Sequence, residues 1–221
     1  MELYDVMRTT FAAREFLDEP VTDGDIRNIL DNSRFAPSGG NRQGWRVIVI
    51  REPATREAML PMIMPTFQRY VAQVQAGEAP WNTINETRLT AEEIAATEPP
   101  EAFIRQVLAA PVLLLVLVDL SVVASFDAQL DRVGVISGAS IYPFVWNILL
   151  AARNEGLGGT LTTFIAGREG EVRDLLGIPD HLAVAALLPI GRPVKQLTRL
   201  SRKPVDEFAM RERWDGAPLS N

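Results

Sequence analysis

The chain has 221 residues, of which 47% are hydrophobic and 23% are charged, and its net charge of -6 corresponds to a pI of about 5.0. An acidic balance is not typical of proteins that bind nucleic acids broadly, so we expect no nucleic-acid partner. The chain has no cysteine and one histidine, which excludes disulfides, a cysteine nucleophile and a metal site built from thiolates or several histidines.

The length of the chain predicts one domain that spans residues 1–221. Its N-terminal sequence and its cysteine content predict a cytoplasmic location. The N-terminal sequence MELYDVMRTT lacks the apolar core of a signal peptide, and the absence of cysteine agrees with a reducing cytoplasm. The apolar stretch at 110–120 is too short to cross a bilayer, and the stretch at 133–152 is interrupted by Ser137, Pro143 and Asn147. We therefore expect no membrane partner.

The first elements of the chain are predicted to be a helix, a strand and a second helix. Thr22 stands three residues before Asp25 in an N-cap pairing, and apolar residues follow at helical spacing as far as Leu30. The β-branched run at 46–52 predicts a strand, and a further helix is expected from residue 53.

Residues 61–106 differ in composition from the rest of the chain. Five prolines fall between positions 61 and 100, and six glutamates stand against one arginine between Glu78 and Glu101. We interpret this segment as a variable excursion of low order within the single domain. It is either a plain surface excursion or a lid that shapes a substrate site.

The middle of the chain predicts a buried strand and a long apolar helix. A helix at 101–110 leads into a continuous apolar strand at 111–119, which is expected to be buried on both faces. A helix over about 130–154 is apolar on nearly every side, which favours the core of a homodimer. An intrachain core helix is the alternative.

The last third of the chain adds two strands and a helix. Gly156 and Gly158 are predicted to end the long helix. Strands are expected at 159–164 and 183–193, and the helix between them ends at Gly177. Helices and strands do not alternate strictly, so the order favours an α+β fold.

The stretch FAPSGGNRQGW, residues 35–45, is the best candidate site. It places glycines and the amide side chains of Asn41 and Gln43 between a helix and a strand, without a carboxylate, histidine or cysteine. Amides donate and accept hydrogen bonds at once, as a flat ring with alternating carbonyl and N–H groups requires. The alternative is a loop whose amides cap its own backbone.

Two groups of cationic residues form a second candidate site. Arg8 and Arg14 lie near the start of the chain, and Arg199, Arg202 and Lys203 lie near its end. Arginine is the preferred bidentate partner of phosphate, so the two groups could converge on one anion. Two solvated charged segments are the alternative.

Taken in order, these motifs resemble the nitroreductase family of FMN-dependent oxidoreductases. The family has an Arg-Arg-Ser-x-Arg-x-Phe element, then Pro-Val, a helix and Ala-Pro-Ser-x-x-Asn-x-Gln-Pro-Trp before a strand. The corresponding segments are TFAAREF (10–16), PV (20–21) and APSGGNRQGW (36–45). Downstream, NEGLGG, RDLLGIP, LLPIGRP and RKPVDE match the family's C-terminal signatures.

The resemblance implies a central, mostly antiparallel sheet flanked by helices in an intertwined homodimer. It also implies roles for individual residues. Arg14 and Arg202, with Arg199, would hold the FMN phosphate. The family's Arg-Arg-Ser aligns with Thr10, Phe11 and Ala12, so Ala12 would lie beside the cofactor and Arg8 would substitute from one turn earlier.

The ring of the flavin would be held by two further segments, according to the resemblance. Pro37, Ser38, Gly39 and Asn41 would line the isoalloxazine from the partner subunit, with Gln43 close by. The backbone of Leu161, Thr162 and Thr163 would present an N–H group to the flavin N5.

The activity implied is hydride transfer from NAD(P)H to the flavin and then to a small electron-poor acceptor such as a nitroaromatic or quinone, in ping-pong order. No side-chain acid or base is expected to act in catalysis, and no metal is expected. Other flavin chemistry on the same scaffold stays open, namely ene reduction, dehalogenation, dehydrogenation or flavin fragmentation. A non-catalytic flavin-binding protein is the remaining alternative.

Overall fold

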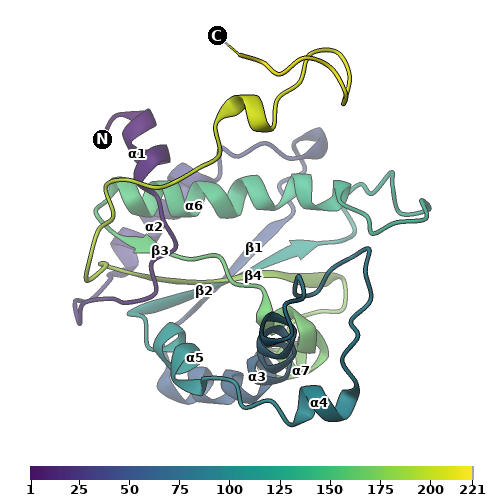
Figure 1. The fold of residues 1–221 in the computed structure, drawn as a ribbon. Coiled ribbons are helices and arrows are strands. Elements are labelled where there is room, and N and C mark those ends of the chain that lie inside the picture. Colours follow the sequence, from purple (N-terminus) through teal and green to yellow (C-terminus); the bar gives the residue numbers. More distant parts are fainter. Residues whose placement is uncertain (221) are drawn as a thin grey trace.

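The computed structural model describes residues 1–220, which are built around a four-stranded sheet. The strands β1 (Trp45–Ile50), β2 (Val112–Asp119), β4 (Leu182–Gly191) and β3 (Gly158–Gly159) lie in that order, and each neighbouring pair is antiparallel. Helices cover both faces of the sheet (Figure 1). The predicted α+β class, with a mainly antiparallel central sheet, is confirmed.

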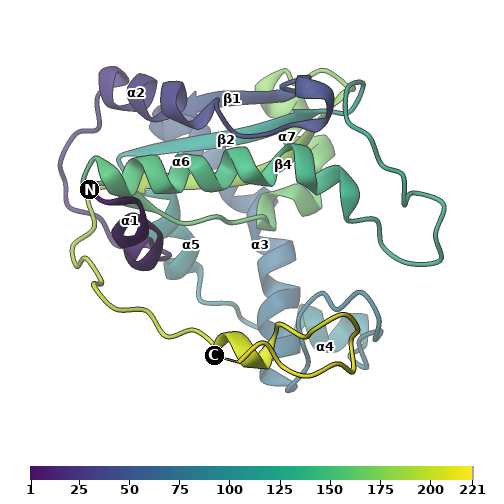
Figure 2. The same ribbon diagram turned by 90° about the horizontal axis from the view of Figure 1, so that it is seen from above.

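Alternate residues of β2 face two separate cores, as the pleat of a strand requires. The even-numbered residues from Val112 to Val118 join one apolar cluster, and the odd-numbered residues from Leu113 to Leu117 join the other. The face with the even-numbered residues carries α1 (Leu3–Thr9), α2 (Asp23–Ser33) and α6 (Tyr142–Asn154) (Figures 1 and 2). The opposite face carries α3 (Pro53–Gln75), α5 (Glu101–Leu108) and α7 (Glu169–Leu176). Helix α4 (Ala91–Ala95) packs against α3. The predicted burial of this strand on both faces is confirmed.

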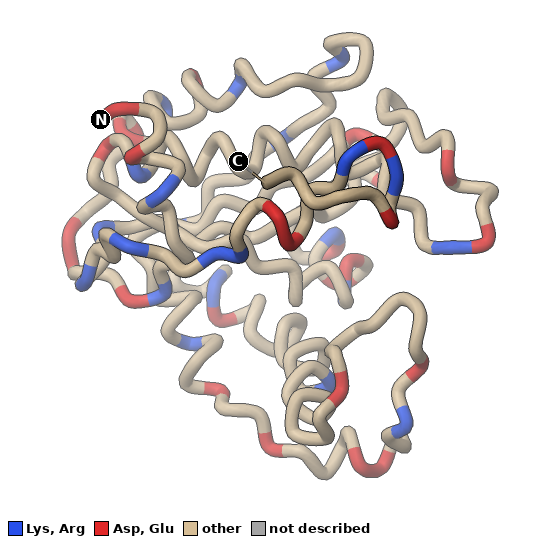
Figure 3. Tube along the Cα trace, turned by 45° about the horizontal axis from the view of Figure 1, so that its top comes forward, with Lys and Arg blue, Asp and Glu red and all other residues tan. Residues whose placement is uncertain are grey.

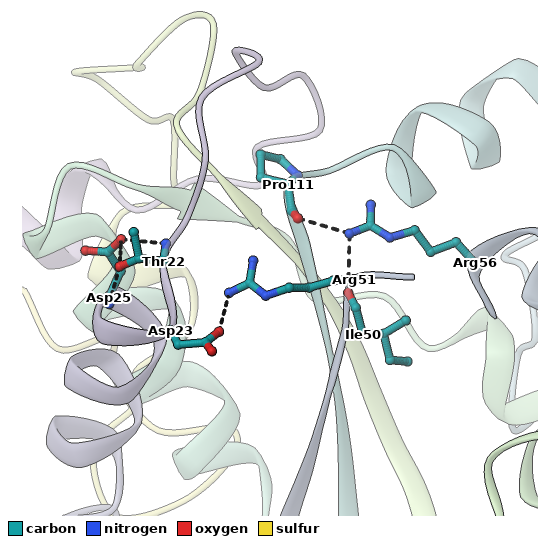
Figure 4. A network of polar contacts seen from close by, with 7 residues as sticks. All are labelled: Thr22, Asp23, Asp25, Ile50, Arg51, Arg56 and Pro111. Carbon is teal, nitrogen blue, oxygen red and sulfur yellow. Dashed lines mark hydrogen bonds and ion pairs between the residues drawn. The ribbon is translucent and has the colours of Figure 1, made fainter. Parts of the chain in front are cut away.

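The predicted start of α2 is confirmed by a capping box (Figure 4). The Thr22 hydroxyl accepts a hydrogen bond from the Asp25 backbone N–H at 3.1 Å, and the Asp25 carboxylate accepts one from the Thr22 N–H at 2.8 Å. The Thr22 hydroxyl also donates to the Asp25 carboxylate at 2.7 Å, and this bond together with that from the Thr22 N–H lowers the pKa of Asp25. An ion pair of 2.9 Å between Asp23 and Arg51 joins the same turn to the end of β1.

The side chain of Arg56 ties α5 to the sheet. Its guanidinium donates to the carbonyls of Ile50 at 3.3 Å and Pro111 at 3.0 Å (Figure 4), and also to those of Leu108 and Ala110. Partial burial lowers the pKa of this guanidinium. Arg56 therefore fixes the C-terminal end of α5, a helix that lines the candidate site described below.

The low order predicted for residues 61–106 is wrong. Helix α3 continues through Pro61 and Pro65 to Gln75, and α4 and α5 follow within the segment. Proline breaks a helix unless packing compensates for the lost hydrogen bonds. Here the buried apolar residues of α3, from Met59 to Phe67, hold the helix against the sheet through both prolines.

The predicted helix over 130–154 is wrong in its first half. Helix α6 begins at Tyr142, with Pro143 in its first turn, after a 3₁₀ turn η2 (Ile136–Ser140). The Asp127 carboxylate accepts bonds from the Val135 N–H at 2.7 Å and from Arg132 at 2.8 Å, which stabilises an irregular loop instead of a helix. Within the described chain α6 is buried along one side, not all round.

The strand predicted at 159–164 is reduced to β3, and Gly158 belongs to that strand instead of capping α6. A Cβ on Gly159 would lie 2.5 Å from the Pro189 carbonyl oxygen, so only glycine fits this approach to β4. Beyond β3 the backbone rejoins β4 at one bridge, between Thr162 and Leu187. The predicted end of α7 at Gly177 is confirmed by its left-handed φ of 65°.

After β4 the chain runs beside α1 and then projects from the α6 side of the molecule (Figures 1 and 2). The Gln196 side chain donates to the Thr9 carbonyl at 3.0 Å, which holds the first part of this tail against the end of α1. None of the helices in residues 1–220 combines the length and hydropathy that a bilayer crossing requires.

Candidate functional site

A pocket of about 590 Å³ lies on the face of the sheet that α3 and α5 cover. Its walls come from the backbone segment Thr160–Thr163, from α3, from α5, from the loop at Pro80–Trp81 and from Arg14. The volume lies within the range of small-molecule sites, which is about 300–1,000 Å³. The pocket brings together two sets of predicted site residues, Arg14 and the segment Leu161–Thr163.

The segment Leu161–Thr163 offers unused backbone donors to this pocket. Thr162 exchanges two hydrogen bonds with Leu187, of 3.1 and 2.8 Å, and is thereby fixed to β4. Within residues 1–220 the N–H groups on either side, those of Leu161 and Thr163, make no hydrogen bond. Leu161 and Thr163 are exposed, so water can satisfy these donors in the free protein, and an acceptor atom of a bound molecule can take its place.

Arg14 stands at the pocket wall because its neighbours pair with β3. Ala12 bridges to Gly159, and the Ala13 N–H donates to the Gly159 carbonyl at 3.0 Å. Arg14 donates to the Ala12 carbonyl at 3.3 Å, and its guanidinium carbon lies 5.7 Å from the centre of the Phe103 ring. No carboxylate in residues 1–220 forms an ion pair with Arg14, so its charge is available to an anion.

The amide loop, residues 37–43, lies elsewhere on the chain. It precedes β1 at the start of that strand and does not line the pocket in the part of the chain that the structure describes. The Gly39 N–H donates to the Ser140 hydroxyl oxygen at 3.1 Å, the Gln43 N–H donates to that of Ser38 at 3.0 Å, and the Gln43 amide donates to Asn41 at 3.2 Å. The bonds of Gln43 to Ser38 and Asn41 lie within the loop, so the alternative in which these amides support their own loop holds in part.

The backbone of the amide loop is held in an uncommon conformation. Gly40, Asn41 and Gln43 have φ values of 59°, 53° and 51°. Left-handed conformations are rare for residues other than glycine, although asparagine tolerates them better than most. Pro37, Gly39, Asn41 and Gln43 are exposed, so the loop presents its polar groups outward.

The other predicted cationic residues do not line the pocket in the described chain. The guanidinium carbon of Arg8, on α1, lies 5.8 Å from the centre of the Tyr4 ring. Arg202 donates to the adjacent Ser201 carbonyl at 2.6 Å, and Arg199 lies in the same tail. Figure 3 shows basic residues recurring along this tail.

Sequence reasoning missed the aromatic wall of the pocket. Phe67 and Tyr70 come from α3, Phe103 from α5, Trp81 from the loop after α3 and Phe164 from the 3₁₀ turn η3 (Phe164–Arg168). The spacing of Leu60, Ile63 and Phe67 in α3 carries a helical period that could have extended the predicted helix. Nothing in the sequence alone places Trp81 against it.

A comparison of the sequence with known families matches the Nitroreductase family over residues 7–192. The fold and the matched length together define the class of protein, and the chain belongs to the nitroreductase family. The resemblance inferred from the motifs is thereby confirmed.

Several curated relatives match most of the chain. An NADH dehydrogenase of Thermus thermophilus is 27% identical over 209 residues, which are 89% of each chain. A nitrobenzene nitroreductase of Ectopseudomonas oleovorans is 26% identical, over 92% of this chain and 94% of its own. Human iodotyrosine deiodinase 1 is 25% identical, over 94% of this chain and 67% of its own.

Solved structures share the fold. A BluB-like flavoprotein from Clostridium difficile superimposes with a TM-score of 0.68 at 22% identity, over 95% of this chain and 98% of its own. An iodotyrosine deiodinase bound to FMN and 3-iodo-L-tyrosine superimposes with a TM-score of 0.65 at 24% identity, over 92% of this chain and 96% of its own.

Proposed function

We propose that the protein is an FMN-dependent oxidoreductase that takes hydride from NAD(P)H and passes it to a small electron-poor acceptor such as a nitroaromatic or quinone. The observation that carries the proposal is the pocket in which an available guanidinium, that of Arg14, lies with the free N–H groups of Leu161 and Thr163. Membership of the nitroreductase family supports it. The FMN bound in the deiodinase structure supports the choice of cofactor.

The residues of the pocket fit this cofactor in size and in chemistry. Aromatic and aliphatic walls suit a flat heteroaromatic ring, and the unpaired backbone N–H groups suit acceptor atoms at its edge. Arg14 would bind the phosphate, with Arg199 and Arg202 of the tail as further partners and Arg8 and Ala12 near the same end. When bound, FMN would supply the ring atom that accepts and delivers hydride.

We further propose that the active protein is a homodimer in which the amide loop of one subunit lines the flavin of the other. The loop is exposed in the single chain, and aromatic residues on the outer side of α6, Tyr142 and Trp146, are 43% and 42% exposed. Trp214 of the tail is 89% exposed. Apolar surface of this extent on several elements supports an interface. Light scattering in solution tests it, and a monomer would contradict it.

The experiment that tests the function is an absorption spectrum followed by anaerobic addition of NADPH or NADH. We expect bound FMN that bleaches. The variant Arg14→Ala should bind FMN about tenfold to a hundredfold more weakly, because a charge-assisted hydrogen bond contributes about 1.5–3 kcal/mol. Arg34→Ala, on an exposed arginine paired with Asp31 at 2.8 Å, is the control and should leave the affinity unchanged. A protein that cannot be loaded with FMN would overturn the proposal.

Reductive dehalogenation of an aromatic ring is the second candidate function. It is favoured by the deiodinase relatives, which match 94% of the chain. The reaction would consume two electrons and a proton and release halide, with a C–H bond in place of the carbon–halogen bond. No carboxylate lines the described pocket, so a halophenol fits better than a halogenated amino acid, whose ammonium group would have no partner. Halide release from an iodophenol measures this activity.

A further inference from the structure

We propose that Trp81 is the specificity-determining wall of the pocket, and that it selects planar aromatic acceptors that are neutral or anionic. This inference rests on the proposed function and names the acceptor class of the same site. It is carried by the aromatic surfaces that line the pocket, by the contacts that fix Trp81 among them and by the charges that surround it.

Four aromatic rings form one continuous surface beside Trp81. The Phe67 ring lies 5.4 Å from that of Phe103, nearly parallel at 17°, and 5.3 Å from that of Phe164. The Tyr70 and Phe164 rings meet edge to face at 5.3 Å. Such spacings and tilts are favourable for aromatic pairs. The surface therefore has a fixed shape to which a further flat ring can add.

Two hydrogen bonds to α3 fix Trp81 at the wall of the same pocket. Its backbone N–H donates to the Gln73 side-chain oxygen at 3.0 Å, and its indole N–H donates to the Thr66 carbonyl at 3.4 Å. Gln73 is itself 2% exposed, so its amide is held by its surroundings. The positive φ of Trp81, 53°, is unfavourable for a bulky residue and persists where neighbouring contacts over-determine it.

The loop that carries Trp81 is closed by one carboxylate. Glu78 accepts hydrogen bonds from the Thr87 hydroxyl at 2.6 Å and from the Arg88 N–H at 2.9 Å, and the Gln73 amide donates to it at 3.4 Å. Both ends of the loop are thus joined to the end of α3. Of the two alternatives for residues 61–106, this closure favours a segment that shapes the substrate site and not a plain surface excursion.

The charges around the pocket are positive. The Arg69 guanidinium carbon lies 4.2 Å from the centre of the Trp81 ring, and its Nε atom is buried without a hydrogen-bond partner in the described chain. A cation over an indole face is attracted to it, which fixes the plane of the ring. Arg14 lies at the same pocket wall but is assigned to the FMN phosphate, so Arg69 is the cation that remains for the acceptor. A cationic acceptor would be repelled by Arg69, whereas a carboxylate or nitro group would not.

The test compares Trp81→Ala and Trp81→Phe with Ile84→Ala, a control at an exposed position of the same loop. The binding of 4-nitrobenzoate to the FMN-loaded protein is measured calorimetrically without a hydride donor. We expect Trp81→Ala to bind about tenfold more weakly and Trp81→Phe within about threefold of the unchanged protein, since an aromatic pair contributes about 0.5–1.5 kcal/mol beyond area burial. FMN affinity is measured in the same variants. We expect it to fall less in Trp81→Ala than the affinity for 4-nitrobenzoate, because Arg14 and the backbone of Leu161–Thr163 also hold the cofactor, and Ile84→Ala should change neither affinity.

A second arm tests the charge. A nitrobenzyl trimethylammonium salt should bind at least tenfold more weakly than 4-nitrobenzoate, and equal or tighter binding would identify an aromatic cage for cations instead. If Trp81→Ala binds 4-nitrobenzoate as tightly as the unchanged protein while FMN is bound and can be reduced, the inference about Trp81 is overturned and the proposed function is not. Absence of reduction by NAD(P)H in the FMN-loaded unchanged protein overturns the proposed function, while the calorimetric comparison, which needs no hydride donor, still decides the role of Trp81. A protein that binds no FMN overturns both.

Discussion

The side chain of Ser140 and the backbone of Gly39, which are 101 positions apart in the chain, are joined by a hydrogen bond of 3.1 Å in which the Gly39 N–H donates. Ser140 ends the 3₁₀ turn before α6, and Gly39 lies in the amide loop. The contact therefore connects the loop proposed to line the flavin of the partner subunit to the helix proposed to form the dimer interface.

We expect Ser140→Ala to weaken FMN binding about fivefold, because a typical hydrogen bond contributes about 1 kcal/mol and its loss frees the amide loop. Fluorescence titration of the protein with FMN measures the change. Ser137→Ala is the matched control, since its hydroxyl makes no hydrogen bond among residues 1–220. Equal FMN affinities of the two variants would mean that the contact does not position the loop.

Asp127 makes the loop before α6 sensitive to acid. Hydrogen bonds from the Val135 N–H and from Arg132 lower the pKa of Asp127 from its ordinary value of 3.8 to about 2. A carboxylate whose pKa is lower in the folded state stabilises that state above its ordinary pKa. This stabilisation is lost as the pH falls from about 4 through about 2.

The variant Asp127→Asn should therefore lower the thermal unfolding midpoint by about 3 °C or more at pH 7. The difference from the unchanged protein should shrink as the pH falls from about 4 to about 2, because the carboxyl is protonated first in the unfolded state and then in the folded state. Asp131→Asn, on an exposed residue without an ion pair in the described chain, should change neither value. A difference that is constant down to pH 2 would show that the charge of Asp127 does not stabilise the loop.

Elements with a local signal in the sequence were predicted well. The capping pair Thr22 and Asp25, the apolar run of β2 and the glycine at position 177 act through neighbouring residues, and each marks an element boundary or a buried strand in the structure. The fold also brings Arg14 and Leu161–Thr163, which the motif resemblance assigned to the cofactor, to one pocket. Their role in holding FMN stays a prediction.

Features that depend on contacts between distant residues were not predictable. Helix α3 continues past Pro61 because its apolar face packs on the sheet, and α6 starts late because Asp127 organises the loop before it. The place of Trp81 depends on the buried amide of Gln73. The sequence gives the residue type at such positions but not the distant residue that it contacts, so the aromatic wall of the pocket could not be predicted.

The glycine at position 159 is predicted to be irreplaceable. A Cβ there would lie 2.5 Å from the Pro189 carbonyl oxygen and 2.6 Å from the Ile190 Cδ1 atom. We expect Gly159→Ala to destabilise the protein by about 1–3 kcal/mol, as overpacking does, and to displace the segment that begins at Thr160. Urea unfolding measures the loss.

Gly170→Ala is the matched control for this substitution. Gly170 lies in α7, and a Cβ there would meet no atom within 4 Å. An alanine in a helix is more favourable than glycine by about 0.5–1 kcal/mol, so this variant should be more stable than the unchanged protein. Equal effects of the two variants would contradict the close approach of β3 to β4.

Glu78 is expected to act as a positioning residue for Trp81. Hydrogen bonds from the Thr87 hydroxyl and the Arg88 N–H lower the pKa of Glu78, so the loop closure is present above the ordinary carboxyl range and is lost as the pH falls through the lowered pKa. In Glu78→Gln the neutral amide accepts these bonds more weakly. We expect KM for a nitroaromatic to rise about threefold to tenfold at pH 7, with kcat and FMN affinity unchanged.

Steady-state kinetics with 4-nitrobenzoate measure the split between KM and kcat. Glu86→Gln is the control, because Glu86 is exposed on the same loop and accepts no hydrogen bond in residues 1–220. The KM values of Glu78→Gln and of the unchanged protein should converge as the pH falls below the ordinary carboxyl range, since protonation opens the same closure in the unchanged protein. A KM that rises equally in both variants, or that rises together with a fall in FMN affinity, would assign Glu78 to general stability instead of to the placement of Trp81.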